Sequence, residues 1–121
     1  MNRQPPRAVY SLLISLAVFV IATFLRLPSC YESLWLDELH SAWIVADNIS
    51  NVYQRSIIGH QSPCYYFQLW AWQQAVGGSE LMLRLNSVLL VAGGCSVLAF
   101  GITKWTQSSL AGLVAGLLLA I

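Results

Sequence analysis

The sequence predicts an all-α, polytopic membrane protein with several spanning helices and one polar extracytoplasmic loop. Hydrophobic residues make up 57% of the chain and charged residues only 9%, whereas soluble domains carry roughly a quarter charged residues. Apolar runs recur along the chain and are separated by short polar stretches. Because one crossing takes about 20 residues, a chain of 121 residues predicts three spans and the start of a fourth.

The first span is expected over residues 8–27. No charged residue lies between positions 8 and 25, and at ~1.5 Å per residue this run nearly crosses the hydrocarbon core. No small-residue cleavage site follows it, so a retained span is favoured over a signal peptide. Arg3 and Arg7 precede the span and favour a cytoplasmic N-terminus. Under this topology Arg84 also lies inside, and three basic residues lie outside: Arg26, Arg55 and Lys104.

Residues 28–62 are predicted to form the extracytoplasmic loop, which holds four of the five acids and both histidines. Apolar residues recur in it at the spacing of an amphipathic helix lying in the membrane interface: Leu36, Leu39, Trp43 and Ala46. Trp35 suits the headgroup level, as does Trp43. After a break at 48–51, a second short helix is expected over 52–58, ending at Gly59.

The second and third spans are expected over residues 63–77 and 82–103. Pro63 fits the first helical turn, and the glutamines of the second span either face other helices or lie near the far interface. Ser79 is the expected N-cap of the third span. Gly93-Gly94 is expected to provide a small-residue surface for close helix contact.

Residues 108–121 begin a fourth span that the chain does not finish. This predicts that the chain is the N-terminal part of a longer membrane protein. Its remaining helices, or a partner membrane protein, would then cover the apolar surfaces of these spans.

The polar residues exclude some classes of function. No cluster of Lys and Arg occurs, so nucleic-acid binding has no electrostatic footprint. Three cysteines without CxxC spacing do not indicate a zinc or thioredoxin-like site. Cys30 and Cys64 bracket the polar loop, where either a disulfide or two unpaired small residues at helix ends would fit; Cys95 lies within a span and is expected to serve packing.

Asp37 and Glu38 are adjacent acids in a chain with few charges. A carboxylate at the bilayer centre costs ~2.5–3.5 kcal/mol, so both are expected at the interface, in a wet cavity or beside a cation. A helix that starts near Asp37, with Asp37 as N-cap and Glu38 in the first turn, would also be favoured by the helix dipole alone, by ~0.3–1 kcal/mol. The pair therefore has both a structural and a functional interpretation.

Four short motifs in order resemble the N-terminal part of the GT-C glycosyltransferases, over about residues 10–105. They are RLP at 26–28, WLDE at 35–38, GHQSPCYY at 59–66 and GGSELMLRLNS at 77–87. The resemblance is strongest to dolichyl-phosphate-mannose protein mannosyltransferases and the bacterial lipid A aminoarabinose transferase. Two positions depart from the family pattern: Ser62-Pro63-Cys64-Tyr65 replaces Pro-Pro-Leu-Tyr, and Asn86 replaces a proline.

The resemblance implies transfer of a sugar from a polyprenyl-phosphate donor to an extracytoplasmic acceptor. It assigns catalysis to Asp37, the general base, with Glu38 as its neighbour, and leaves open a divalent cation bound through Asp37. Three further residues are candidates for substrate binding, each with a structural alternative as an interfacial or surface residue: Arg55, His60 and Tyr65. Arg84 is expected to pair with or cap near Glu80 on the cytoplasmic side. The resemblance implies a bacterial inner membrane, or the endoplasmic reticulum membrane in a eukaryote.

A second interpretation is a protein without catalytic activity. In this case the chain would be a small membrane subunit, or a vestigial piece of such a transferase, that packs with partner helices.

Overall fold

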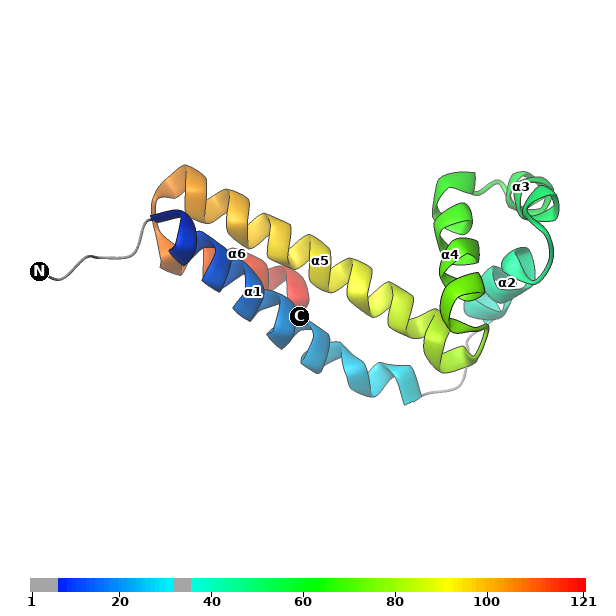
Figure 1. Ribbon diagram of the computed structural model, residues 1–121, viewed down its shortest axis with the longest axis horizontal. Helices are drawn as coiled ribbons and strands as arrows, with labels where there is room; N and C mark the ends of the chain where they lie inside the picture. Colours follow the sequence, from blue (N-terminus) through cyan, green and yellow to red (C-terminus); the bar gives the residue numbers. More distant parts are fainter. Residues whose placement is uncertain (1–6, 32–35) are drawn as a thin grey trace, which may run out of the picture. The chain divides into compact units, whose positions relative to one another are not determined.

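The computed structural model describes residues 7–31 and 36–121, and every regular element within them is helical (Figure 1). In chain order the elements are α1 (Arg7–Arg26), the 3₁₀ helix η1 (Leu27–Tyr31), α2 (Leu36–Val45), α3 (Ile49–Ile58), α4 (Pro63–Val76), α5 (Glu80–Thr106) and α6 (Ser109–Ala120). The prediction of an all-α fold is confirmed for these residues. Arg3 and Trp35, used in the predictions of topology and interface, lie outside them.

The chain divides into two compact units. Unit 1 comprises Met1–Pro28 and Val88–Ile121, and unit 2 comprises Ser29–Ser87. Helix α5 contributes its first residues to unit 2 and the remainder to unit 1. Ser79 caps α5 as predicted, because its Oγ accepts a hydrogen bond from the backbone N–H of Met82 at 3.4 Å.

By length and composition, two helices within the described residues could cross a membrane: Ala8–Tyr31 and Glu80–Thr106. Helix α6 is apolar but has only 12 residues. Helix α4 has 14 residues, a length of about 21 Å against a hydrocarbon core of about 30 Å. The helix predicted at 63–77 is therefore present, but it lacks the length that its predicted role as a span requires.

Unit 1 is held together by small residues. Its buried core consists of Val18, Ala22, Ala92, Cys95, Ala99 and Ala120. Gly112 and Gly116 are also buried, and a Cβ at Gly116 would lie 2.7 Å from Cγ1 of Val18. The backbone of α6 thus comes close to its neighbours because no side chain stands between them.

A close helix contact was expected at Gly93-Gly94, and among the described residues no neighbour lies against either glycine. A Cβ added at either glycine would meet nothing within 4 Å. The contact lies at Gly112 and Gly116 instead, which are four residues apart and so share one face of α6. Gly112 and Gly116 have the GxxxG spacing that is typical of close helix contacts, so the sequence did carry a signal for this pair.

Unit 2 packs α2, α3 and α4 around a core of Ile44, Val45, Val52, Tyr66 and Leu69. Helix α3 begins at Ile49, three residues earlier than the expected start at Val52, and ends at Gly59 as predicted. The earlier start has a local cause. The Asn48 side chain accepts a hydrogen bond from the N–H of Asn51 at 3.1 Å and caps the helix.

The predicted apolar stripe of α2 does not face the core of unit 2. Leu36 is 82% exposed, Leu39 51% and Trp43 47%, whereas the buried residues of α2 are Ile44 and Val45. An outward apolar stripe on a short helix is what an interfacial helix requires, since that stripe would face lipid.

The cysteines are not paired. Cys30 and Cys95 are buried, Cys64 is exposed, and all three are free thiols. Of the two alternatives for Cys30 and Cys64, the structure therefore has unpaired residues at the ends of helical segments, with Cys30 in η1 and Cys64 in the first turn of α4.

Candidate functional site

Asp37 and Glu38 lie in the first turn of α2, which begins at Leu36. Asp37 is therefore inside the helix and is not its N-cap, contrary to the expectation. Adjacent residues of a helix point about 100° apart, so the two side chains diverge. Asp37 is exposed, whereas the Glu38 side chain is 43% exposed and points towards Arg84.

Glu38 forms an ion pair with Arg84 of α5. Nη2 of Arg84 lies 2.6 Å from Oε2 of Glu38, and Nη1 of the same guanidinium donates to the backbone carbonyl of Ser29. The Arg84 side chain is only 8% exposed. This partly buried cation links α2, the turn after α1 and the start of α5 within unit 2.

The prediction that Arg84 pairs with or caps near Glu80 is wrong, because its guanidinium pairs with Glu38. Arg84 and Glu38 are 46 residues apart in the chain but share unit 2. A span over residues 63–77 would separate the two side chains by the thickness of a bilayer, but α4 has only 14 residues. Nothing in local sequence spacing signals this pair.

A small pocket adjoins the ion pair. It has a volume of about 50 Å³ and is lined by Glu38, Ser41, Ala42, Tyr65, Leu69, Leu83, Arg84 and Ser87. The hydroxyls of Tyr65 and Ser87 lie 3.4 Å apart at its edge. Asp37 is not among the lining residues. The volume admits water but not a sugar, since sites for small molecules usually occupy about 300–1,000 Å³.

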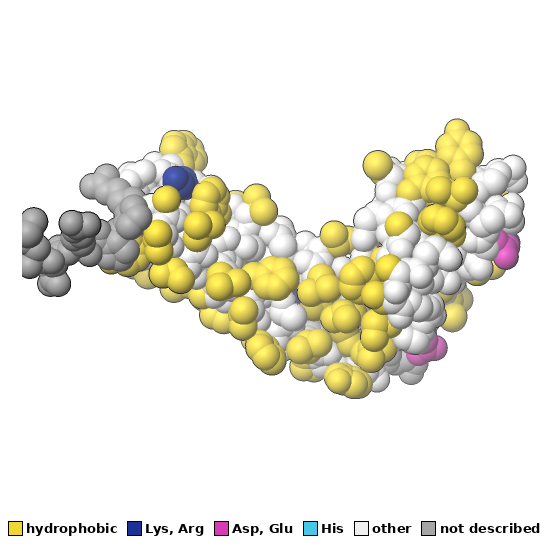
Figure 2. Space-filling model, viewed as in Figure 1, with side chains coloured by type: hydrophobic (Ala, Val, Ile, Leu, Met, Phe, Trp, Pro, Cys, Tyr) yellow, Lys and Arg dark blue, Asp and Glu magenta, His cyan; other side chains and the backbone are white. Residues whose placement is uncertain are grey.

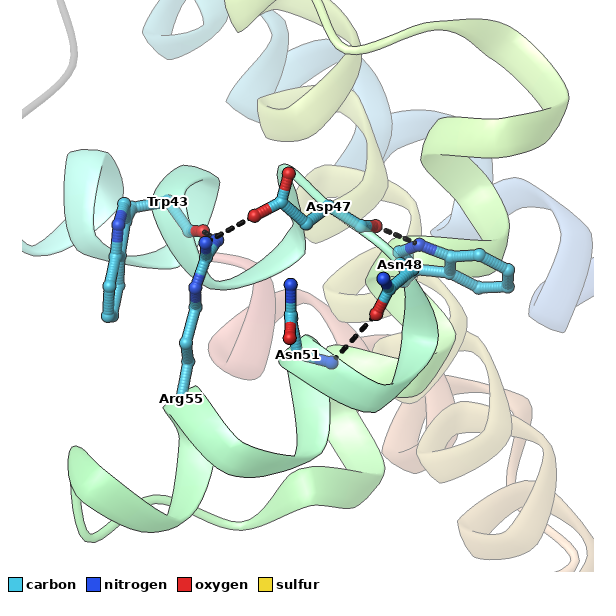
Figure 3. Close-up of polar contacts among 6 residues, drawn as sticks. Trp43, Asp47, Asn48, Asn51 and Arg55 are labelled. Atoms are coloured by element: carbon cyan, nitrogen blue, oxygen red, sulfur yellow. Dashed lines mark hydrogen bonds and ion pairs between the residues drawn. The ribbon is translucent and has the colours of Figure 1, made fainter.

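Arg55, a predicted binding residue, fastens the turn between α2 and α3 (Figure 3). Its Nη1 donates to the backbone carbonyl of Trp43 at 2.5 Å, and its Nη2 forms an ion pair with Asp47. The guanidinium also lies 4.5 Å from the centre of the Trp43 ring. Trp70 completes the cluster, because its Nε1–H donates to the carbonyl of Asp47 at 2.8 Å. These contacts give Arg55 a structural role.

The histidines lie apart from the pocket. His60 is exposed and has a positive φ of 52° in the turn that follows α3. His40 of α2 packs against Trp43, with ring centroids 5.6 Å apart. Among the described residues, no group of three His, Cys, Asp or Glu side chains is arranged to hold a metal ion.

Asn86, one departure from the family pattern, has a partner of its own. It is 2% exposed and forms a two-way amide pair with Gln68 of α4. Nε2 of Gln68 donates to Oδ1 of Asn86 at 2.7 Å, and Nδ2 of Asn86 donates back at 3.2 Å. Of the two alternatives for the glutamines, Gln68 thus takes the first and faces another helix. A proline at 86 could not make this pair, so the asparagine is explained by its neighbour.

The described residues therefore bring together Glu38, Arg84 and Tyr65, leave Asp37 exposed beside them, and place Arg55 and His60 elsewhere in unit 2. Compared with models of protein families, with curated proteins and with solved structures, the chain has no match.

Proposed function

We propose that this chain is an integral membrane protein whose N-terminus is cytoplasmic. Two observations support the proposal. Only 17% and 28% of the apolar windows of the two long helices are buried, whereas the core helix of a soluble protein would be mostly covered. Lys104, near the end of α5, lines a cavity with Tyr10 and Ser11, near the start of α1. Lys104 thus lies close to the N-terminal end of α1. Basic residues gather on the cytoplasmic side of membranes, so its position agrees with a cytoplasmic N-terminus.

This arrangement differs from the expected topology, in which Lys104 lay on the side opposite the N-terminus. With α4 too short to cross, α1 and α5 run in opposite directions as successive spans. Arg26 then remains at the other end of α1, where its Nε donates to the carbonyl of Ala120 at 3.2 Å.

We propose further that the protein takes part in sugar transfer from a polyprenyl-phosphate donor, in the manner of the GT-C glycosyltransferases it resembles. The observation that carries this proposal is the division between the two adjacent acids. Glu38 is neutralised by Arg84, whereas the exposed Asp37 carboxylate has no hydrogen bond or ion pair among the described residues. Asp37 is thus available to accept a proton.

In the proposed step, the acceptor hydroxyl gives its proton to Asp37 while its oxygen forms a bond to the anomeric carbon. The bond between that carbon and the phosphate oxygen breaks, and polyprenyl phosphate leaves with the electron pair. Leu36 and Leu39, exposed beside Asp37, would keep this end of α2 at the membrane surface, where the donor's head group lies. A divalent cation, if bound, would take Asp37 as one ligand and would need oxygens of the donor phosphate as others.

The test is the release of polyprenyl phosphate from a panel of polyprenyl-phosphate sugars by the protein in proteoliposomes, measured by mass spectrometry. Asp37→Asn should lower the rate by about 10²–10⁴-fold, the contribution of a general base. Glu80→Gln, which removes an equal charge from the same unit, is the control and should keep its activity. A fully active Asp37→Asn protein would remove the assignment.

A second candidate is a subunit without catalysis, and the size of the pocket favours it. A volume of about 50 Å³ cannot enclose a sugar, so a transfer site would need further helices around it. This candidate predicts no release of polyprenyl phosphate from any donor, and stable co-purification with a larger membrane protein.

A further inference from the structure

The charges of the chain are divided between the two units. All five acids lie between positions 32 and 80, so the residues of unit 1 include no acid at all. Unit 1 nevertheless includes Arg26 and Lys104, and Lys104 is the chain's single lysine. The acidic side chains visible in Figure 2 accordingly lie over unit 2. The side chains of unit 1 therefore offer an anion positive charge and no carboxylate.

Unit 1 contains a cavity of about 410 Å³, a size typical of sites for small molecules. It is lined by Tyr10, Ser11, Thr103, Lys104, Gln107 and Ser109. Each of these six side chains is polar, four of them bear a hydroxyl and one is a cation. Such a lining offers hydrogen-bond donors around one positive charge.

The wall around Lys104 is held in place by the turn between α5 and α6. Gln107 has a positive φ of 57°, and its Nε2 donates to the backbone carbonyl of Lys104 at 2.6 Å. Ser108 caps α6 by accepting a hydrogen bond from the N–H of Ala111 at 3.3 Å. Thr103 is 6% exposed and its hydroxyl is without a hydrogen-bond partner among the described residues. These hydrogen bonds fix the backbone of the turn, and Lys104 lines the cavity beside it.

We propose that this cavity binds a phosphate group, and that the phosphate belongs to an anionic phospholipid. Lysine binds phosphate as a compact charge, and hydroxyls donate to the remaining oxygens. The cavity lies where α1 begins and α5 ends, and the ends of spanning helices are where headgroups lie. Exposed leucines follow the lining residues along α1 and α6: Leu13 is 55% exposed and Leu110 is 69% exposed. Both would lie beside the acyl chains of the lipid.

The site consists of residues of unit 1. It rests on the proposed insertion in a membrane but not on sugar transfer. Its test is protection of Lys104 from acylation by an amine-reactive reagent, read on the Lys104 peptide by mass spectrometry. The full chain is compared in nanodiscs of phosphatidylcholine alone, in nanodiscs that also contain phosphatidylglycerol, and in detergent with inorganic phosphate. We expect strong protection with phosphatidylglycerol and little with phosphatidylcholine alone.

Retention of phosphatidylglycerol on the purified protein provides the second readout. Lys104→Gln should weaken it about fivefold, the effect of one lysine near a membrane surface, and Lys104→Arg should retain it. Arg26→Gln removes the same charge from the opposite end of α1 and is the matched control. Equal losses in Lys104→Gln and Arg26→Gln would overturn the proposal in favour of general surface attraction.

The three conditions also distinguish the phosphate of a lipid headgroup from free inorganic phosphate. Protection by phosphatidylglycerol alone supports the lipid site. Equal protection by inorganic phosphate supports the phosphate site but overturns its assignment to lipid. Lys104 that reacts at the same rate under all three conditions overturns both.

Discussion

Substitution of Gly116 tests the packing of unit 1 most directly. A Cβ at this position would lie 2.7 Å from Cγ1 of Val18, 3.0 Å from Cβ of Ala99 and 3.1 Å from the carbonyl oxygen of Cys95. All three neighbours belong to the buried core, and one of the contacts is to backbone, so none can move away freely. Gly116→Ala is therefore expected to force α6 outwards.

The magnitude follows from two opposing effects. Overpacking of a core costs about 1–3 kcal/mol. Replacing glycine by alanine inside a helix returns about 0.5–1 kcal/mol, because alanine loses less backbone freedom on folding. The net loss in the free energy of unfolding should be about 1–2 kcal/mol for Gly116→Ala.

Gly101→Ala is the matched control. Gly101 lies in α5, also in unit 1, and a Cβ there would meet nothing within 4 Å. This variant should gain about 0.5–1 kcal/mol, so the two alanines should differ by about the full cost of overpacking. Both are measured by reversible unfolding in mixed micelles with increasing SDS, followed by far-UV circular dichroism. Equal changes in the two variants would refute the close approach of α6.

Two further predictions concern unit 2 and the thiols. Glu38→Gln should lower the free energy of unfolding by about 1.5 kcal/mol, the low end for a hydrogen bond to a charged group. The low end applies because the Glu38 side chain is 43% exposed and its ion pair is partly screened by water. The same titration measures it, and an unchanged midpoint would contradict the importance of the pair with Arg84. Cys64 should react with a maleimide in the folded protein, whereas Cys30 and Cys95 should react only after unfolding. Mass spectrometry identifies the labelled peptides. An unlabelled Cys64 or a labelled Cys95 in the folded protein would contradict this prediction.

Local features of the fold were predictable because they depend on neighbours in the sequence. The uncharged run after Arg7, the cap at Ser79 and the end of α3 at Gly59 are each set within a few residues. The start of α3 was misplaced because Asn48 can belong either to a break or to a cap, and its hydrogen bond to Asn51 decides between them.

The site was predictable only in part, because its geometry depends on residues distant in the chain. Glu38 was located correctly in the first turn of a helix, whereas Asp37 was expected at the N-cap and lies inside the helix. No pattern linked Glu38 to Arg84, 46 residues later. The same limit applied to Asn86, whose partner Gln68 lies on another helix. In each case the sequence identified a polar residue in an apolar region, and only the fold supplied its partner.

The open surroundings of Gly93-Gly94 have a mechanical consequence for α5. Because no neighbour among the described residues requires a bare backbone there, the main effect of the two glycines is to lower the stiffness of the 27-residue helix. Sharp bends of long helices concentrate at such residues. If α5 flexes during the working cycle of the protein, this pair is where the hinge would lie.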